Sequence, residues 1–160
     1  MSTDLDLLNH RIDDDEDTTK DLYLSFIVDN DEYAISVTNV KEIIPMQKIT
    51  VVPETPDYVR GIINLRGDIV PVIEISRRFM KPDKEIDENT CIVIINHPDY
   101  AHPLGLIVDR VVGVYTITDE FVTEPPKAKL SYSNMYVKNI GKTHDGLKLL
   151  LDLDKLIGQG

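Results

Sequence analysis

The chain reads YVRGIINLRGDIVPVIEISRRF from Tyr58 to Phe79 and YVKNIGKTHDGLKLLLDLDKLI from Tyr136 to Ile157. The two stretches align without a gap, and residue types agree at several positions, such as Tyr58 with Tyr136, Ile62 with Ile140 and Glu74 with Asp152. Each copy reads as a strand, a tight turn, a second strand and a short helix, because apolar residues alternate on both sides of the turn. The pattern indicates a duplicated small β unit.

A second pair of segments repeats upstream of these copies. Leu22–Val28 alternates between apolar and polar residues, and Glu32–Val37 follows after a short turn, which predicts a β-hairpin. A similar hairpin is predicted from Thr90–Asn96 and Leu104–Val108. We therefore predict an all-β fold with short helices, built as two pseudo-symmetric small barrels or curled sheets, because closing a sheet removes its exposed edges.

The predicted ordered domain covers residues 21–158, with its two lobes divided near the charged connection 81–89. Packing of the C-terminal segment back on the first lobe is left open as an alternative arrangement. Within the first lobe, Thr38-Asn39 is expected to cap a short helix through Val40 and Glu42, stopped before Pro45. Ile49–Val52 is expected to be a further strand.

Composition limits the classes of function. The chain has 160 residues and a net charge of −11, which argues against nucleic acid and anionic membrane surfaces as partners. One cysteine excludes a disulfide framework, and no segment reads as a secretory signal or a membrane span, so we expect a cytoplasmic protein. Residues 1–20 carry seven acids and two bases and are expected to be a disordered acidic leader.

The sequence contains few residue patterns typical of an enzyme active site. The four histidines lack metal-ligand spacing, and no nucleophile or phosphate-binding motif is complete, so we expect no catalytic residues, metal, cofactor or small-molecule substrate. Glu74 and Asp152 recur at matching positions before the short helices, where a carboxylate in the first helical turn is favoured.

The turn Asn64-Leu65-Arg66-Gly67 is the exception. An arginine surrounded by apolar residues such as Ile63 and Ile69 is a common composition for an interface anchor. A solvated arginine at a hairpin tip is the alternative that the turn alone leaves open.

At these residues the chain resembles the CheW family, the coupling proteins of bacterial chemotaxis. The resemblance covers residues 20–158 and rests on five stretches taken together: Val40–Ile43, Gly61–Gly67, Ile69–Ile75, Leu104–Asp109 and Leu149–Leu156. It implies two five-stranded, SH3-like β-barrels. It also implies an adaptor between the cytoplasmic tips of chemoreceptors and the regulatory domain of the histidine kinase CheA.

The resemblance also implies site residues. Those matching the family's receptor-facing surface are Val40, Glu42, Gly61, Asn64, Arg66, Gly67 and Val114. Gly105 matches a glycine linked in the family to kinase contact. The chain departs from the family pattern at Asn139, where glycine is usual, and at Glu74, where aspartate is commoner. Asn139 is expected to keep a positive φ, which asparagine tolerates.

Two alternatives stay open on the sequence alone. One is a CheW-like module of a different receptor–kinase pathway, or the CheW-like half of a fusion with a receiver domain. The other is an undetected enzyme on a double β-barrel, which only the scatter of acidic residues favours.

Overall fold

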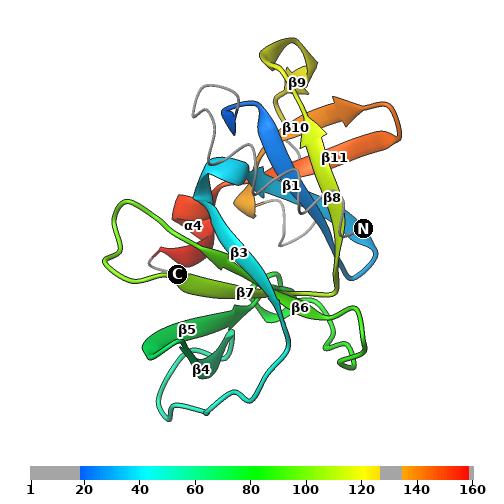
Figure 1. Cartoon of the computed structure of the whole chain (residues 1–160). Helices are drawn as coiled ribbons and strands as arrows, with labels where there is room; N and C mark the ends of the chain where they lie inside the picture. Colours follow the sequence, from blue (N-terminus) through cyan, green and yellow to red (C-terminus); the bar gives the residue numbers. More distant parts are fainter. Residues whose placement is uncertain (1–18, 127–134, 159–160) are drawn as a thin grey trace. The chain divides into compact units, whose positions relative to one another are not determined.

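The computed structural model describes residues 19–126 and 135–158 (Figure 1). The chain divides into two compact units: Met1–Thr38 with Val111–Gly160, here called the terminal unit, and Asn39–Arg110, here called the central unit. Strands dominate both units and the helices are short, which confirms the predicted all-β class. The predicted leader falls almost wholly outside the described residues.

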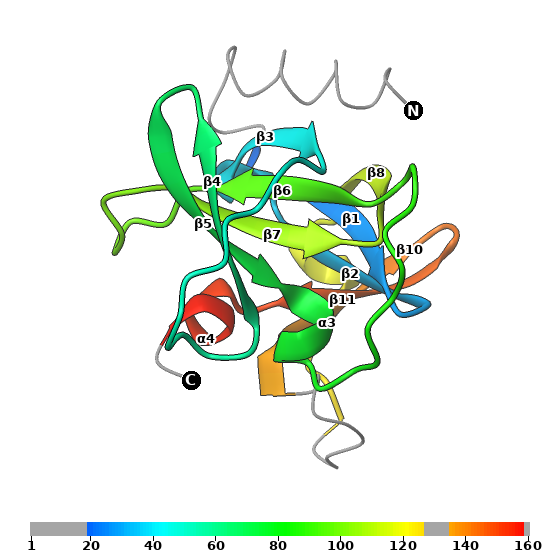
Figure 2. The ribbon, with the colours of Figure 1, turned by 90° about the horizontal axis from the view of Figure 1, so that it is seen from below.

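The central unit is a five-stranded sheet in the order β3-β6-β7-β5-β4. Its strands are β3 (Val40–Pro45), β4 (Val59–Leu65), β5 (Asp68–Glu74), β6 (Cys91–Ile95) and β7 (Leu104–Val108). Neighbouring strands run antiparallel except β5 and β7, which run parallel. A single-turn helix, α3 (Ile75–Arg78), continues directly from β5 (Figure 2).

This sheet curls until its two edges meet. β3 and β4 are the outermost strands, yet Thr50, shortly after β3, pairs with Ile62 of β4 through two backbone hydrogen bonds of 2.9 Å each. The curl encloses a buried apolar cluster made of Ile63, Leu65, Val70, Val72, Ile92, Ile94 and Ile107. Burying each such side chain contributes about 1.5–3 kcal/mol, so this enclosed face supplies much of the unit's stability.

The terminal unit is a six-stranded sheet in the order β8-β1-β2-β11-β10-β9. Its strands are β1 (Leu22–Val28), β2 (Asp31–Ser36), β8 (Arg110–Thr116), β9 (Val122–Thr123), β10 (Val137–Thr143) and β11 (Gly146–Leu151). Among the described residues, the chain also contains the 3-10 turns η1 (Val37–Asn39) and η2 (Asp119–Phe121) and the helix α4 (Leu153–Ile157). Five strands per lobe were predicted. The central unit has five, and the terminal unit adds the two-residue β9. Within the described ranges, no helix has the length and apolar character needed to cross a membrane.

The predicted duplication is visible in the strand register. β5 pairs in parallel with β7 so that Val72 lies opposite Gly105, and β11 pairs in parallel with β2 so that Leu150 lies opposite Ala34. The turn into each short helix is closed by the same 2.8 Å backbone bond, to the carbonyl of Tyr58 in one unit and of Tyr136 in the other. The two units therefore repeat one strand arrangement.

The predicted lobe boundary near 81–89 is wrong, because those residues lie inside the central unit, between α3 and β6. Each unit combines the opening hairpin of one repeat with the closing hairpin of the other: β6–β7 joins β4–β5, and β1–β2 joins β10–β11. The two sequence repeats follow one another along the chain, whereas each hydrogen-bonded sheet combines one hairpin from each repeat. The C-terminal segment does share a sheet with the N-terminal hairpin.

The short helix predicted after Thr38-Asn39 is also wrong. η1 ends at Asn39, and Val40–Pro45 forms β3, paired along its length with β6. The β-branched side chains of Val40, Ile43 and Ile44 favour a pleated strand, and tertiary pairing decides the conformation of so short a segment. The strand predicted at Ile49–Val52 is reduced to the single bridge at Thr50.

Candidate partner-binding site

A tight turn places Arg66 at the tip of the β4–β5 hairpin. Arg66 and Gly67 both have positive φ, +53° and +91°, which are the values of a type I′ turn between antiparallel strands. Asn64 supports the turn, because its Oδ1 accepts a 2.8 Å hydrogen bond from the backbone N–H of Gly67. Three of the predicted site residues thus build one turn.

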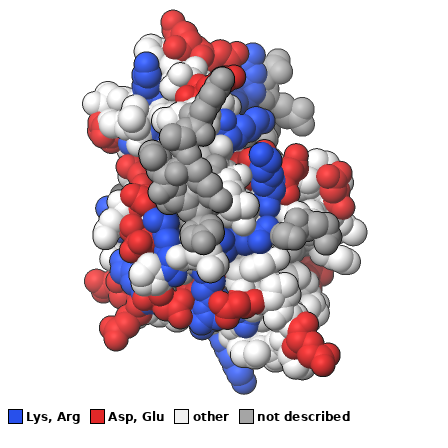
Figure 3. Space-filling model, turned by 180° about the vertical axis from the view of Figure 1, so that it is seen from behind, with Lys and Arg blue, Asp and Glu red and all other residues white. Residues whose placement is uncertain are grey.

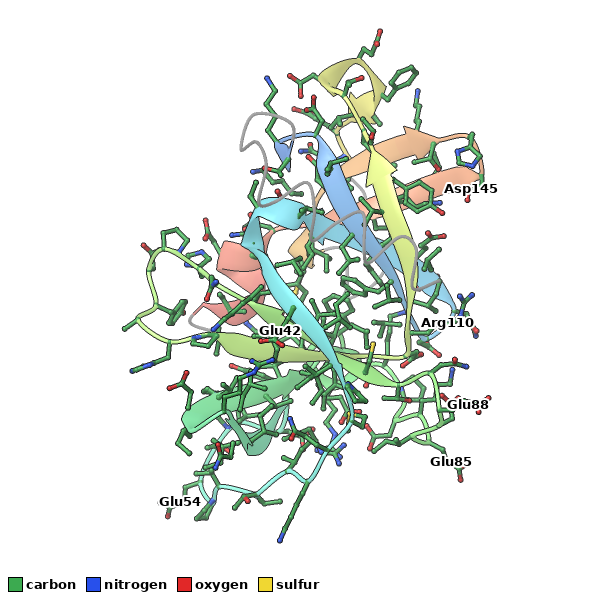
Figure 4. The ribbon with its side chains drawn as sticks, viewed as in Figure 1. Glu42, Glu54, Glu85, Glu88, Arg110 and Asp145 are labelled. Atoms are coloured by element: carbon green, nitrogen blue, oxygen red, sulfur yellow. The ribbon has the colours of Figure 1, made fainter. Side chains whose placement is uncertain are left out.

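The Arg66 guanidinium is held by Glu42 of β3, which is labelled in Figure 4. Nη1 donates to Oε2 at 2.7 Å and Nη2 donates to Oε1 at 2.6 Å. Paired donors matched to paired carboxylate oxygens fix the guanidinium's direction as well as its position. The Arg66 side chain is 68% exposed and that of Glu42 23%, so the pair lies at the surface.

Hydrogen bonds from Arg66 lower the pKa of Glu42, aided by the positive charges of Arg66 and Lys41 and opposed by partial desolvation. The same hydrogen bonds raise the pKa of Arg66. Both groups are therefore charged at neutral pH. Because solvent screens an exposed pair, its main effect is to orient Arg66 rather than to stabilise the fold.

Two other predicted receptor-facing residues are buried beneath this surface. Val40 starts β3 and is 6% exposed. Gly61 has a φ of +147°, and a Cβ built there would lie 2.1 Å from the carbonyl oxygen of Thr50. Gly61 is thus the position that lets Thr50 approach β4 and close the curl.

Gly105 and Val114 are placed separately. Gly105 is buried in β7, and a Cβ there would lie 2.8 Å from Ile92 Cγ2, beside the apolar cluster. A partner therefore has no direct access to it in this structure. Val114 is half-buried on β8 of the terminal unit, whereas the Arg66 turn belongs to the central unit.

The family model described as the CheW-like domain matches residues 22–160. The chain belongs to the CheW family. The resemblance expected from the sequence motifs is thereby confirmed.

Individual CheW relatives match most of this chain, and one relative of known structure shares its fold. The chemotaxis protein CheW of Bacillus subtilis is 34% identical over 139 residues, covering 87% of this chain and 88% of the relative. The chemotaxis protein CheW of Klebsiella aerogenes is 31% identical over 135 residues, covering 84% and 80%. The crystal structure of the scaffolding protein TtCheW from Thermoanaerobacter tengcongensis superposes with a TM-score of 0.79 at 30% identity, covering 88% of this chain and 94% of that one.

This CheW-family chain also exposes an apolar face that sequence reasoning did not assign. On β5, Ile69 and Pro71 alternate with the buried Val70 and therefore point outward, and Ile69 is 57% exposed. On β4, Ile62 lies opposite Pro71 on the same outer face. An apolar run along both faces of a strand reads as fully buried, so only the structure separates the outer from the inner residues.

The two helix-start carboxylates behave differently in this CheW fold. Asp152 caps α4 as predicted, since its Oδ1 accepts a 3.2 Å bond from the backbone N–H of Lys155. Glu74 makes no side-chain cap bond to α3 and instead pairs with Arg60 at 2.6 Å and Arg77 at 3.3 Å. The longer glutamate side chain reaches basic partners on neighbouring segments.

The expectation for Asn139 is wrong. It occupies the position in the second repeat that Gly61 occupies in the first, yet Asn139 does not belong to the described residues with positive φ. Both copies carry a register shift at this position, between Val59 and Gly61 in the first and between Val137 and Asn139 in the second. The bulge is therefore kept in the second copy, but without the positive φ of Gly61.

Proposed function

We propose that this CheW-family protein is a non-enzymatic adaptor that couples the cytoplasmic tips of chemoreceptors to a CheA-type histidine kinase. The observation that carries the proposal is the exposed Arg66 guanidinium, oriented by Glu42 at the tip of the β4–β5 hairpin. Relatives of this chain carry the names chemotaxis protein and scaffolding protein, which supports the same role. The adaptor acts in the cytoplasm, at receptor arrays on the inner face of the membrane, through its partners.

Arg66 is the residue proposed to anchor the receptor. A guanidinium carries five N–H donors, and the two bonds to Glu42 leave donors for an acceptor on the receptor. Asn64 and Gly67 hold the turn, whereas Val40 and Gly61 shape the sheet beneath it. Val114, on β8 of the terminal unit, is proposed as a separate receptor contact.

The kinase side is proposed to use the apolar outer face of β4 and β5. Ile69 is its most exposed strand residue, flanked by the half-buried Ile62 and Pro71. A partly exposed aliphatic face suits packing against another small β-barrel such as the regulatory domain of the kinase. Gly105 contributes indirectly, because its missing side chain lets β5, β6 and β7 pack closely.

The charge distribution fits protein partners. Basic and acidic side chains are interspersed over the face shown in Figure 3, with no continuous basic region on it. A nucleic acid would require such a region. Mixed charges around apolar positions are typical of the rim and core of a protein interface.

Calorimetry with two purified partners tests the proposal: a receptor fragment containing the cytoplasmic tip and the regulatory domain of a CheA-type kinase. We expect the protein to bind both, separately and together, because the proposed receptor contact is the Arg66 side chain at the tip of the β4–β5 hairpin and the proposed kinase contact is the apolar outer face of its strands. Failure to bind either partner would reject the adaptor and leave a different receptor–kinase pathway or an enzymatic role to be examined.

A further inference from the structure

The interior of the two units differs at one end of the repeated sheet. The strand register matches Ser25 with Ile94, Thr143 with Leu65, and Lys148 with Val70. The central unit is apolar at all three positions, and the terminal unit is polar at all three. Ser25 is fully buried and Lys148 is 1% exposed, so these polar groups lie inside the fold.

Lys148 is the centre of this polar layer. Its Nζ lies 2.8 Å from Asp145 Oδ1 and 3.2 Å from Glu32 Oε2, and it sits 4.5 Å from the centre of the Tyr115 ring. Glu32 belongs to β2, and Lys148 belongs to β11, so the longer ion pair joins the two hairpins.

Further hydrogen bonds complete the layer. Thr143 Oγ1 donates to Asp145 Oδ1 at 2.8 Å, and the Tyr115 hydroxyl donates to Asp145 Oδ2 at 2.8 Å. Ser25 Oγ donates to Glu32. Asp145 stands at the tip of the β10–β11 hairpin (Figure 4), and hydrogen bonds from Lys148, Thr143 and Tyr115 hold its pKa well below its usual range.

Because the chain is duplicated, its hairpins could pair in more than one way. β4–β5 and β10–β11 are copies of one hairpin, so β1–β2 has two similar candidate partners on the same chain. Pairing with β4–β5 would put Glu32 beside Val70, with no cation. It would also leave Lys148 with Asp145 alone, without the carboxylate of Glu32. A buried cation is costly unless its charge is fully compensated, so losing one of its two carboxylate partners destabilises that arrangement.

We propose that the polar layer of Ser25, Glu32, Thr143, Asp145 and Lys148 selects which hairpins pair, directing β1–β2 to β10–β11 and away from β4–β5. The layer acts by penalising the wrong arrangement more than by stabilising the right one. It thereby specifies the strand exchange that builds both units.

The test uses the full chain with the near-isosteric double variant Lys148→Met with Glu32→Gln, which removes both charges that link the hairpins. The matched control is Lys84→Met with Asp109→Asn, which removes an ion pair of 3.7 Å within the central unit. Each protein is unfolded, refolded and examined by NMR, with amide contacts between β2 and β11 compared with those between β2 and β5.

We expect the layer variant to show a second set of β2 amide signals with contacts to β5, at a population on the order of a tenth, while wild type and control show one set. A single set of signals in the layer variant, with only a lower melting temperature, would overturn the proposal, because the layer would then merely stabilise the fold. If the double variant does not fold, Glu32→Gln alone carries the same test, since Lys148 keeps Asp145. One signal set in that variant would equally overturn the proposal.

Discussion

Arg66 and Glu42 meet through two hydrogen bonds of 2.7 and 2.6 Å, although the arginine side chain is 68% exposed. Glu42 comes from β3, at one edge of the central sheet, and Arg66 follows β4, at the other edge. The pair therefore forms only where the curled sheet brings its edges together. Its exposure and fixed direction make it the best-defined element of the proposed receptor site.

Replacing Arg66 should weaken receptor binding without affecting the fold. We expect Arg66→Ala to weaken binding of a receptor fragment by roughly thirtyfold or more if the new contact is desolvated. Arg66→Lys should also lose affinity, because an ammonium cannot bond both oxygens of Glu42 in the same plane. Calorimetry measures both affinities.

Arg110→Ala, at another exposed arginine, is the matched control for that experiment. Kinase-domain binding and Tm should stay unchanged in all three variants. An effect below about fivefold for Arg66→Ala would place Arg66 at a solvated rim, and a joint loss of kinase binding would make it a structural residue.

The ionisation of Glu42 should depend on Arg66. Its pKa is lowered in the folded protein, so the pair's contribution is complete at neutral pH and is lost as pH falls through that lowered value. Carboxylate-detected NMR titration should give a midpoint below the usual glutamate range in wild type. In Arg66→Ala the midpoint should rise. An unchanged midpoint would show that the pair does not persist in solution.

Gly61 and Gly67 should respond differently to alanine. At Gly61 the new Cβ would meet the Thr50 carbonyl, and its φ is +147°, so we expect a loss of roughly 2–5 kcal/mol in unfolding free energy. At Gly67 nothing lies within 4 Å and only the positive φ opposes alanine, so the loss should be about 1–2 kcal/mol. Denaturant unfolding measures both. Equal losses would contradict the close approach of Thr50.

The proposed kinase surface is tested by Ile69→Asp. Ile69 is 57% exposed, so the variant should keep its Tm while its affinity for the kinase regulatory domain falls at least tenfold. Gly105→Asp should instead destabilise the fold by roughly 3–5 kcal/mol, because its carboxylate would be buried beside Ile92. Unchanged kinase affinity in Ile69→Asp would move the contact elsewhere.

The helix caps give a test confined to the terminal unit. Asp152→Ala removes the side-chain acceptor for the Lys155 N–H and should cost about 1 kcal/mol. Asp152→Asn keeps an acceptor oxygen and should cost much less. Thermal unfolding distinguishes the two variants, and identical losses would mean that charge rather than capping stabilises α4.

Much of the fold was predictable because local patterns act over a few residues. Alternation predicted β1 and β7 with their observed bounds, and the repeated motif predicted two similar sheets. The Val40–Pro45 segment was predicted incorrectly because a segment of six residues is too short for its pattern of apolar residues to distinguish a helix from a strand. Pairing with β6 settles such a case, and that partner is distant in the sequence.

The site was predictable only in outline. The sequence marked the turn residues Asn64, Arg66 and Gly67, because glycine and asparagine at a hairpin tip indicate a specific turn chemistry. Sequence alone did not show that Gly61 and Gly105 are buried. A glycine can be required because a binding partner approaches it closely or because other atoms of the same protein do, and the sequence does not distinguish the two cases.

The sequence by itself determined the β class, the duplication and the arginine turn, since these follow from periodicity and residue chemistry along the chain. Only the tertiary structure decided which hairpins share a sheet and which face of β5 is exposed. Hydrogen bonds between strands and burial of side chains depend on neighbours far apart in sequence. Because the β4–β5 and β10–β11 hairpins follow the same sequence pattern, the pattern does not determine which of them pairs with β1–β2. That choice requires contacts such as those of Lys148 with Glu32, which exist only after the strands have paired.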